Sequence, residues 1–457
     1  MKPMKLLIAV GVLAILGGLV YYTEQNPPAP DDDRVAVIEL EEPAIQAVTI
    51  HRPDKDPLRI ERAGEEDWRF GEPVAAIRVD GFAVQTLVSQ FTPLNAERVI
   101  EETVEDWSPY GLGGEGTLKA VVETEGGQTY ELILGRDTPT GSGVYARLAG
   151  DPRLFLVYSF IKSGLDKEPF DLRDKKLVDV DANTISRVVL KTGQQSIEFG
   201  KAGENRWQIL QPKPLRADNF TVGDLVRSVQ NAEMATVLSE GEEPSASYPF
   251  TRPYAVVEVT DESGAHTLTA AQSGDSAYYA RSSDLTGVYE VSSTFAEGLN
   301  KQLDEFRNKK LFDFGFEDPL RLRLRDGDTE VVIAKKEDQW VAESDGGRQL
   351  SAERVQAVID SLRNLTSIAF ASDEAPAQAG YGLSEPDIEL EVTPAPEGSE
   401  PERVVVSSPE EDRVYAAIPG LPTTYELEKS AVEQIQRSIE ELLEPAEGAE
   451  PEAPADN

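Results

Sequence analysis

Apolar residues recur with helical spacing at three separate places along the chain. Each place has the pattern i, i+3, i+4, i+7, which puts the apolar side chains on one face of an amphipathic helix. An Asp or a Ser stands four residues before each pattern, where its side-chain oxygen can accept the free N–H groups of the first turn. We therefore predict three capped helices. The caps and apolar positions are Asp80 with Val84, Leu87, Val88 and Phe91; Asp218 with Val222, Leu225, Val226 and Val229; and Ser351 with Val355, Val358, Ile359 and Leu362.

Aromatic residues keep a fixed register with these helices. A tryptophan precedes each helix, and a tyrosine follows 26 residues after the first apolar helix position. We expect each tryptophan to end a sheet strand and to pack under the capped helix. Gly111 and Gly382 follow two of the tyrosines and can turn the chain at positive φ, whereas Pro249 follows the third. The predicted core residues of the repeat are Trp68, Trp207, Trp340, Tyr110, Tyr248 and Tyr381.

Strands fill the rest of each repeat. Alternating apolar and polar residues predict one strand after each tyrosine, and an aromatic-bearing strand later in the repeat. The strings VYARL, YYARS and VYAAI lie between them, at Val144, Tyr278 and Val414. A short helix then closes the repeat, as at Ser430–Leu443. The predicted strands are Leu118–Glu123, Val256–Thr260 and Ile388–Val392, then Leu154–Val157, Val288–Val291 and Thr424–Leu427.

A ten-residue segment occurs twice. Asp171–Val180 reads DLRDKKLVDV and Glu305–Phe314 reads EFRNKKLFDF, with five identical positions at a spacing of 134 residues. The segment precedes the second and third repeats but not the first, so we interpret it as the junction between repeats. Its basic residues either contact a partner or a membrane, or tie one repeat to the next, and we favour the tie. The predicted junction residues are Arg173, Lys175, Lys176, Arg307, Lys309 and Lys310.

The predicted fold class is α+β, because strands joined by turns favour antiparallel sheets covered by helices. We expect an N-terminal transmembrane helix followed by three tandem repeats, each with one capped helix and one short closing helix. The expected segments are a cytoplasmic N-terminus (1–5), a transmembrane anchor (6–23), a linker (24–43), repeats at 44–170, 171–304 and 305–443, and a disordered acidic tail (444–457).

The anchor is predicted from 18 uncharged residues, Leu6–Thr23. As a helix they would rise about 27 Å, close to the thickness of a bilayer core. Lys2 and Lys5 precede the segment, which places the N-terminus in the cytoplasm and the bulk of the chain outside. A cleaved signal peptide is the alternative, but the bulky pair Tyr21 and Tyr22 ends the segment and no A-x-A-like site follows.

The overall charge and the absence of cysteine narrow the function classes. The chain has 44 basic and 83 acidic residues, a net charge of -39. So negative a surface disfavours nucleic acid and favours solubility, cations or basic partners. Because there is no cysteine, disulfides, thiolate metal sites and cysteine nucleophiles are excluded.

Candidate metal sites are weak. Asp179, Asp181 and Asn183 match the first three ligand positions of a calcium loop, but the required glycine and glutamate are replaced by Thr184 and Leu190. We interpret this segment as a polar turn before a strand. The acidic cluster at 326–328 is predicted to be a hairpin turn.

Candidate catalytic residues are equally few. His51 and His266 are the two histidines, so a zinc site would lack ligands and a serine hydrolase would have to use one of them. No G-x-S-x-G motif or phosphate-binding glycine loop is present. We assign no catalytic, cofactor-binding or metal-ligating residue and expect no cofactor.

The anchor, the spacing from tryptophan through capped helix to Tyr-Gly-Leu, and the R-D/N-K-K-L junction together resemble the domain-of-unknown-function 4340 family. The resemblance extends from about Ala44 to Leu443, and the middle copy departs from it at 248–250. It implies a bacterial protein tethered to the inner membrane, single-pass, with its bulk in the periplasm. Similar proteins encoded beside gliding-type ABC transporter components imply partners in an envelope complex.

Three functions remain open. We expect first a non-catalytic interaction or scaffold protein of the envelope, whose partners include ABC transporter components but no nucleic acid. The second is a binding module for a glycan, peptide or cation in a groove between repeats. The third is a hydrolase that uses paired carboxylates, which cannot be judged from spacing in sequence.

Overall fold

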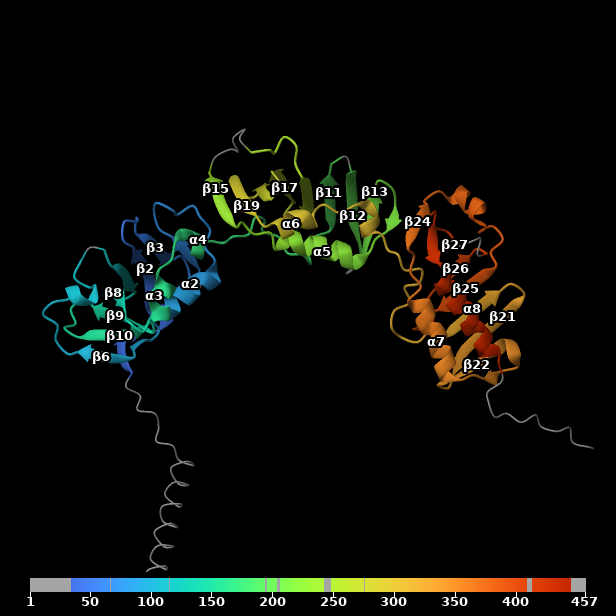
Figure 1. Ribbon diagram of the computed structural model, residues 1–457, viewed down its shortest axis with the longest axis horizontal. Helices are drawn as coiled ribbons and strands as arrows, with labels where there is room; N and C mark the ends of the chain where they lie inside the picture. The colour runs from blue at the N-terminus through green and yellow to red at the C-terminus, as the bar shows by residue number, and fades with distance from the viewer. Residues whose placement is uncertain are drawn as a thin grey trace, which may run out of the picture. The chain divides into compact units, whose positions relative to one another are not determined.

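The computed structural model describes residues 34–65, 67–114, 116–193, 195–203, 206–241, 248–274, 276–408 and 413–444. The chain divides into two compact units, Met1–Lys175 and Lys176–Asn457. The first unit holds one long sheet and one two-stranded sheet, and the second unit holds two long sheets (Figure 1). We refer to each long sheet with its helices as the first, middle and third module.

The three long sheets share one topology. In each, the first strands form a meander to one edge, with three strands in the first sheet and four in the other two. The strand after the capped helix and its tyrosine pairs with the first strand of the meander. The middle sheet has the order β14-β13-β12-β11-β16-β17-β18-β19-β15, and the third sheet repeats this order. The first sheet has eight strands instead of nine. Every strand pair in the described residues is antiparallel, for example β11 with β16 and β20 with β25.

The elements of each module follow in chain order. In the first module they are β1 (Val35–Ile38), β2 (Ile45–His51), β3 (Leu58–Arg62), β4 (Trp68–Phe70), α2 (Gly81–Val88), β5 (Leu94–Ala96), β6 (Arg98–Glu101), β7 (Leu118–Thr124), β8 (Thr129–Asp137), β9 (Gly143–Leu148), β10 (Leu154–Tyr158), α3 (Ser159–Leu165) and α4 (Pro169–Leu172). In the middle module they are β11 (Arg187–Thr192), β12 (Gln195–Gly203), β13 (Arg206–Gln211), β14 (Leu215–Arg216), α5 (Asn219–Gln230), β15 (Thr236–Glu240), β16 (Ala255–Thr260), β17 (Ala265–Ser273), β18 (Ala277–Ser282), β19 (Gly287–Val291) and α6 (Ser293–Gly298). In the third module they are β20 (Arg321–Asp326), β21 (Thr329–Lys336), β22 (Gln339–Ala342), β23 (Arg348–Gln349), α7 (Ala352–Arg363), β24 (Ala369–Ser372), β25 (Ile388–Thr393), β26 (Glu402–Val406), β27 (Arg413–Ala417), β28 (Thr424–Glu428) and α8 (Lys429–Leu443).

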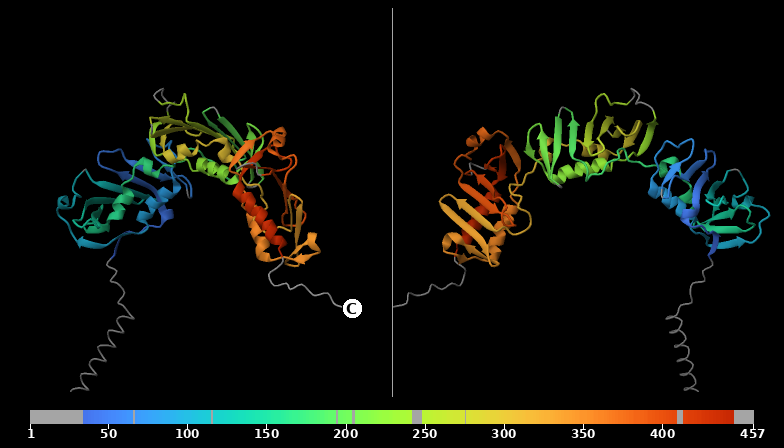
Figure 2. Two further views of the ribbon diagram at one scale, coloured as in Figure 1. Left: turned by 45° about the vertical axis from the view of Figure 1, so that its right-hand side comes forward. Right: turned by 180° about the vertical axis from the view of Figure 1, so that it is seen from behind.

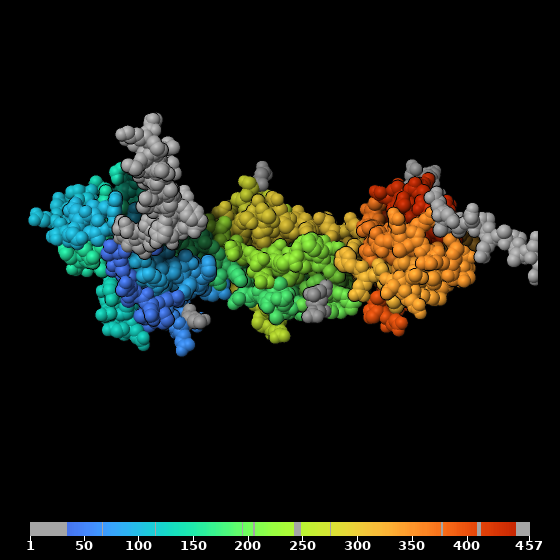
Figure 3. Space-filling model, turned by 90° about the horizontal axis from the view of Figure 1, so that it is seen from below, coloured from blue at the N-terminus to red at the C-terminus, as the bar shows by residue number. Residues whose placement is uncertain are grey.

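Each sheet has two different faces. Because side chains alternate along a strand, one set points to the helices and the other away from them. In β25 the alternate residues Ile388, Leu390 and Val392 are buried against α7 and α8, which lie side by side on that face (Figure 2). Helix α5 covers the corresponding face of the middle sheet, seen from below in Figure 3. We call the face without helices the outer face.

The predicted capped helices form, but one predicted cap does not. Asp80 accepts hydrogen bonds from the N–H groups of Phe82 and Ala83, and Asp218 accepts one from Thr221. The predicted apolar positions of all three helices are buried. Ser351 occupies the cap position of α7 with extended backbone angles, yet its side chain accepts no hydrogen bond.

The tryptophans do not all behave as predicted. Each begins its strand or stands at its second position, instead of ending it. Trp68 and Trp340 are buried in the main cores of their modules. Trp207 is only half-buried, although β13 has the same place in the middle sheet as β22, the strand of the buried Trp340, has in the third. The assignment of Trp207 to the core is therefore wrong.

Several local predictions are confirmed. The six predicted strands are β7, β16, β25, β10, β19 and β28. Gly111 and Gly382 both have a φ of +73°, the left-handed conformation that glycine adopts without strain. Gly327 turns at φ +56° between β20 and β21, so the acidic cluster is a hairpin turn as predicted.

The predicted fold class needs correction. The described residues are mostly antiparallel sheet, and their helices form a thin layer instead of a comparable part of the structure. Among these residues no helix is both long enough and apolar enough to cross a membrane. The predicted α+β fold headed by a transmembrane helix, and the single-pass inner-membrane location with a periplasmic bulk, are therefore not supported.

Some predicted segments fall outside the described residues. These are the cytoplasmic N-terminus (1–5), the proposed anchor (6–23) and residues 445–457 of the proposed tail. Strand β1 lies inside the segment 24–43 that was interpreted as a linker, and it pairs with β5. The closing helix of the third module, α8, has 15 residues and is longer than the capped helix α7, so it is not short.

Candidate functional site

A pair of tyrosines lies on the outer face of every module. Tyr145, Tyr279 and Tyr415 occupy equivalent places in β9, β18 and β27, and each alternates with core residues of the opposite face. Each contacts the tyrosine of the turn that follows the capped helix. The ring centroids are 5.2 Å apart for Tyr110 and Tyr145, 5.4 Å for Tyr248 and Tyr279, and 4.6 Å for Tyr381 and Tyr415.

These pairs correct the predicted role of the turn tyrosines. Tyr110, Tyr248 and Tyr381 are half-buried and lie outside the main cores. In the first module Tyr110 and Tyr145 join a small separate cluster around Leu112, Ile133 and Leu154. One role of the pair is therefore to hold the preceding loop against the outer face.

An arginine stands two residues after the strand tyrosine in two of the modules. The Arg147 guanidinium lies 4.9 Å from the centre of the Trp107 ring, and that of Arg281 lies 5.3 Å from the centre of the Phe250 ring. Stacking on an aromatic face holds the planar guanidinium in place. The third module has Ala417 at this position, so the arginine is a feature of the first two modules only.

These two arginines differ from other arginines on the outer faces. Arg59, Arg187 and Arg325 each pair with a glutamate on a nearby strand. Within the part of the chain that the structure describes, neither Arg147 nor Arg281 makes an ion pair, and the buried Nε of Arg147 has no hydrogen-bond partner. Both therefore present a positive charge without an ion pair on the outer face of a chain of net charge -39.

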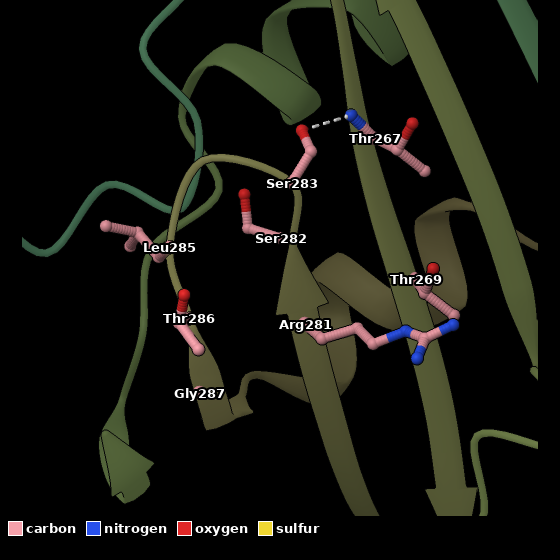
Figure 4. Close-up of a pocket in the computed structure, with 8 residues that line it drawn as sticks. All are labelled: Thr267, Thr269, Arg281, Ser282, Ser283, Leu285, Thr286 and Gly287. Atoms are coloured by element: carbon pink, nitrogen blue, oxygen red, sulfur yellow. Dashed lines mark hydrogen bonds between the residues drawn. The ribbon is translucent and has the colours of Figure 1, made fainter. Parts of the chain in front are cut away.

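Arg281 lines a depression of about 310 Å³ on the outer face of the middle module. Figure 4 shows its side chain extending from β18 across β17 toward Thr269, while Ser283 accepts a hydrogen bond from the Thr267 N–H. The other lining residues come from the end of β18 and the loop to β19. They are Ser282, Leu285, Thr286 and Gly287.

The first and third modules have depressions beside the tyrosine turn. In the third module, a space of about 380 Å³ is lined by both tyrosines of the pair, Tyr381 and Tyr415, together with Ser407. In the first module, a space of about 560 Å³ is lined by Gly111, Arg136 and Lys162 among others. The outer faces of the middle and third modules thus combine an aromatic pair with a nearby hollow, whereas the hollow of the first module is lined by the core residue Leu134 and by Lys162 of α3.

His266 belongs to a polar cluster beside the middle depression. Its Nδ1 lies 2.8 Å from Asp284 Oδ2, and its Nε2 lies 2.8 Å from Ser263 Oγ. A serine, a histidine and an aspartate in this order have the connectivity of a hydrolase triad. The sequence did not reveal it, because Asp284 reaches the histidine only through the pairing of β17 with β18.

The hydrogen bonds of this cluster favour a structural role. The Ser263 hydroxyl donates to Asp261 Oδ1 at 2.7 Å, so the proton that a general base would remove is directed elsewhere. The N–H groups of Ser263 and Gly264, the nearest candidates for an oxyanion hole, also donate to Asp261. Acyl transfer needs such donors free for the developing oxyanion. The cluster is better explained as the closure of the β16–β17 hairpin.

Asp284 also holds the end of the first ten-residue segment. Its carboxylate accepts a hydrogen bond from the Asp179 N–H at 3.2 Å. Burial would raise the pKa of Asp284, but hydrogen bonds from Ser283 and from the Asp179 N–H outweigh it and hold the pKa below its usual value. Asp181 accepts hydrogen bonds from the backbone and side chain of Asn183, which makes the calcium-like segment a turn.

Each copy of the ten-residue segment hydrogen-bonds to the start of one capped helix and to the end of the next. In the second copy, the Asp218 N–H donates to the Phe306 carbonyl before α5, and the Leu311 N–H donates to the Leu365 carbonyl after α7. In the first copy, the Asp80 N–H donates to the Leu172 carbonyl in the first unit. Within the second unit, the Leu177 N–H donates to the Ala232 carbonyl after α5.

The basic residues of the two segments have different surroundings. Arg173 and Arg307 are buried, at 5% exposure each. Arg307 pairs with Asp373 and Asp304 and stacks 3.5 Å from the centre of the Phe370 ring. Lys176, Lys309 and Lys310 are exposed, and Lys175 is half-buried over Phe170. The role of these residues as a tie stays a prediction.

Sequence reasoning missed the outer-face arginines and their aromatic partners. The strings VYARL and YYARS contain Arg147 and Arg281. Their significance depends on which aromatic side chain covers them and on the absence of a carboxylate, and neither can be derived from one strand. His51, in contrast, simply ends β2 and is half-buried.

Comparison with known proteins identifies the family and no closer relative. The model of the family described as Domain of unknown function (DUF4340) matches residues 68–212 and 207–386. The two matches start at Trp68 and Trp207, the tryptophans that set the predicted register. Searches of the curated proteins and of the solved structures gave no match. Because the family model covers well over half of the sequence, the chain belongs to the DUF4340 family.

Proposed function

We propose that the protein is a non-catalytic interaction or scaffold protein that contacts its partners through the outer faces of its modules. The observation that carries this proposal is the tyrosine pair on the helix-free face of every module, which has a hollow nearby in the middle and third modules. Aromatic and arginine side chains are enriched at protein interfaces, because they offer large contact areas with a polar end.

The charges of the outer face support the same function. Cross-strand pairs such as Arg187 with Glu258 hold both charges in fixed positions on a rigid sheet. Fixed charges steer association and select partners more than they add affinity. Components of an ABC-type transport complex are the partners that the family resemblance implies, and this assignment stays a prediction.

Site-specific photo-crosslinking tests the proposed face. Lys191 is exposed on the outer face of the middle sheet, and Arg227 is exposed on α5 on the opposite side. A photo-reactive amino acid at position 191 should give a discrete adduct with one partner in native cells, whereas the same amino acid at 227 should not. An adduct at 227 alone, or none at either position, would contradict the proposal.

A small-ligand binding module is the second candidate. The depression at Arg281 favours it, since a hollow of about 310 Å³ suits a small molecule or a single side chain better than a folded domain. The two functions are compatible, because one group of a larger partner can occupy such a hollow.

A further inference from the structure

The hollow of the middle module offers a guanidinium and several hydroxyl groups for hydrogen bonding. Arg281 is the charged residue among those that line it. Within the described residues, the hydroxyl groups of Thr267, Thr269 and Thr286 make no hydrogen bond. The hydroxyl groups of the two serines are already used, since that of Ser282 accepts from the Asp284 N–H and that of Ser283 donates to the Asp284 carboxylate.

Thr269 contributes a hydroxyl group to the hollow. The residue is 6% exposed and lines the hollow opposite Arg281, its partner across β17 and β18. A buried hydroxyl normally has a hydrogen-bond partner. None is present among the described residues, and the hydroxyl oxygen is not one of the fully buried unpartnered atoms, so it opens to the hollow and is available to water or to a ligand.

Arg281 is positioned before any ligand arrives. Its guanidinium lies 5.3 Å from the centre of the Phe250 ring, a contact that restricts its motion, and Phe250 in turn packs on Tyr248 with ring centroids 6.4 Å apart. A guanidinium held in this way loses little freedom on binding. Its parallel N–H groups match the two oxygens of a carboxylate.

We propose that this hollow, formed by Arg281, Thr267, Thr269 and Thr286, binds a carboxylate group. The site deepens the proposed interaction function and rests on it for its biological meaning. The guanidinium and hydroxyl groups can donate to the two oxygens of a carboxylate, which carries a single negative charge. A phosphate dianion carries more charge and would be repelled more strongly by a protein of net charge -39. An acidic sugar and an acidic peptide carry the same group, and binding experiments distinguish them.

Titration calorimetry on the full-length chain tests the site with defined probes. Glucuronate stands for an acidic sugar and N-acetylglutamate for an acidic peptide, with glucose and inorganic phosphate as controls. We expect at least one acid to bind with a Kd on the order of 1 mM, as for a single small anchored group. Glucose and phosphate should bind at least about tenfold more weakly.

Variants assign the binding to the hollow. Arg281→Ala should weaken binding of the acid at least about tenfold, because charge-assisted hydrogen bonds are lost. Arg206→Ala removes the same charge from β13, near the other edge of the same sheet, and should leave the Kd unchanged. Thr269→Val should weaken binding about threefold and leave the melting temperature unchanged, since the hydroxyl has no internal partner.

Three results would overturn the carboxylate site. The first is that Arg281→Ala binds the acid with the same Kd as the wild type, and the second is that phosphate binds more tightly than either acid. The third is that no heat of binding is measured at about 10 mM of each acid, well above the expected Kd. If the acids fail to bind while the adduct at position 191 forms, the site is wrong and the interaction face stands. If the acids bind as expected but no adduct forms, the interaction function is wrong and the site stands.

Discussion

Residues of the same charge have different roles in the two ten-residue segments. Arg307 is buried with its carboxylate partner Asp373, whereas Lys309 and Lys310 extend into solvent. Removing one partner of a buried ion pair leaves the other without compensation, but an exposed lysine contributes little to stability.

Arg307→Met should therefore lower the free energy of unfolding of the second unit by about 3 kcal/mol. The double variant Lys309→Glu and Lys310→Glu should change it by less than about 0.5 kcal/mol. Urea unfolding followed by tryptophan fluorescence measures both. A larger loss in the lysine variant would show that the lysines, and not the arginine, hold this segment.

Asp373 makes part of the stability dependent on pH. Burial would raise its pKa, but the hydrogen bond from Lys213 and the positive charge of Arg307 outweigh burial and lower the pKa below the usual value. A carboxyl group whose pKa is lower in the folded state stabilises the fold at pH values above its unfolded pKa. This stability is lost as the pH falls through the folded pKa.

The melting temperature of the second unit should consequently fall as the pH is lowered from about 5 toward 2, and part of this fall should come from Asp373. Asp373→Asn removes the titrating group, so its melting temperature should be lower than that of the wild type at pH 6 and should approach it in acid. Differential scanning calorimetry gives both curves. Parallel curves would mean that Asp373 does not contribute.

Among the secondary-structure elements, the capped helices show which features can be predicted from nearby residues in the sequence. Asp218 and Ser351 stand at equivalent positions, but only Asp218 accepts a hydrogen bond from its first turn. Loss of a capping hydrogen bond destabilises a protein by about 1 kcal/mol. Asp218→Ala should show this loss, and Ser351→Ala should be close to neutral. Equal losses in chemical denaturation would contradict the difference between the two caps.

The elements that depend on neighbouring sequence were predictable, and those that depend on distant partners were not. The helix at 352–363 follows from four apolar residues at helical spacing, and the turn at Gly382 follows from a glycine after a tyrosine. The half-buried state of Trp207 does not follow from its spacing, because Trp340 has the same register and the same strand position and is buried. The contact between His266 and Asp284 depends on strand pairing. No local pattern contains that information.

The candidate site was only partly visible in the sequence. The turn tyrosines were found from their spacing, although they were assigned to a core. Their partners Tyr145, Tyr279 and Tyr415 lie in strings that recur in all three repeats, but the recurrence alone assigns them no role. That Arg281 has no carboxylate partner among the described residues is a property of the folded surface. The sequence, with its 83 acidic residues, does not show which arginines form ion pairs.

For the whole molecule, the three modules repeat one sheet and one outer-face aromatic pair but differ in detail. Arg147 and Arg281 have no counterpart in the third module, where Ala417 follows the tyrosine. The family matches begin at Trp68 and Trp207 and end at 386, within the third module. A shared scaffold with different outer faces is what we expect of an array that contacts more than one site on its partners.

The central claim is that partners bind the outer faces and not the helical faces. A triple variant, Tyr145→Ser, Tyr279→Ser and Tyr415→Ser, alters the outer face of every module. A matched variant, Phe82→Ser and Phe220→Ser, alters aromatic side chains that are 82% and 73% exposed on α2 and α5. Melting curves of both variants check that the modules remain folded.

Quantitative co-purification of each variant from crosslinked native cells tests the claim most directly. We expect the amount of partner that co-purifies with the outer-face variant to fall by at least about tenfold, because interface aromatic residues are removed, and the helical-face variant to keep its partner. Retention of the partner by the folded outer-face variant, with loss by the helical-face variant, would contradict the account.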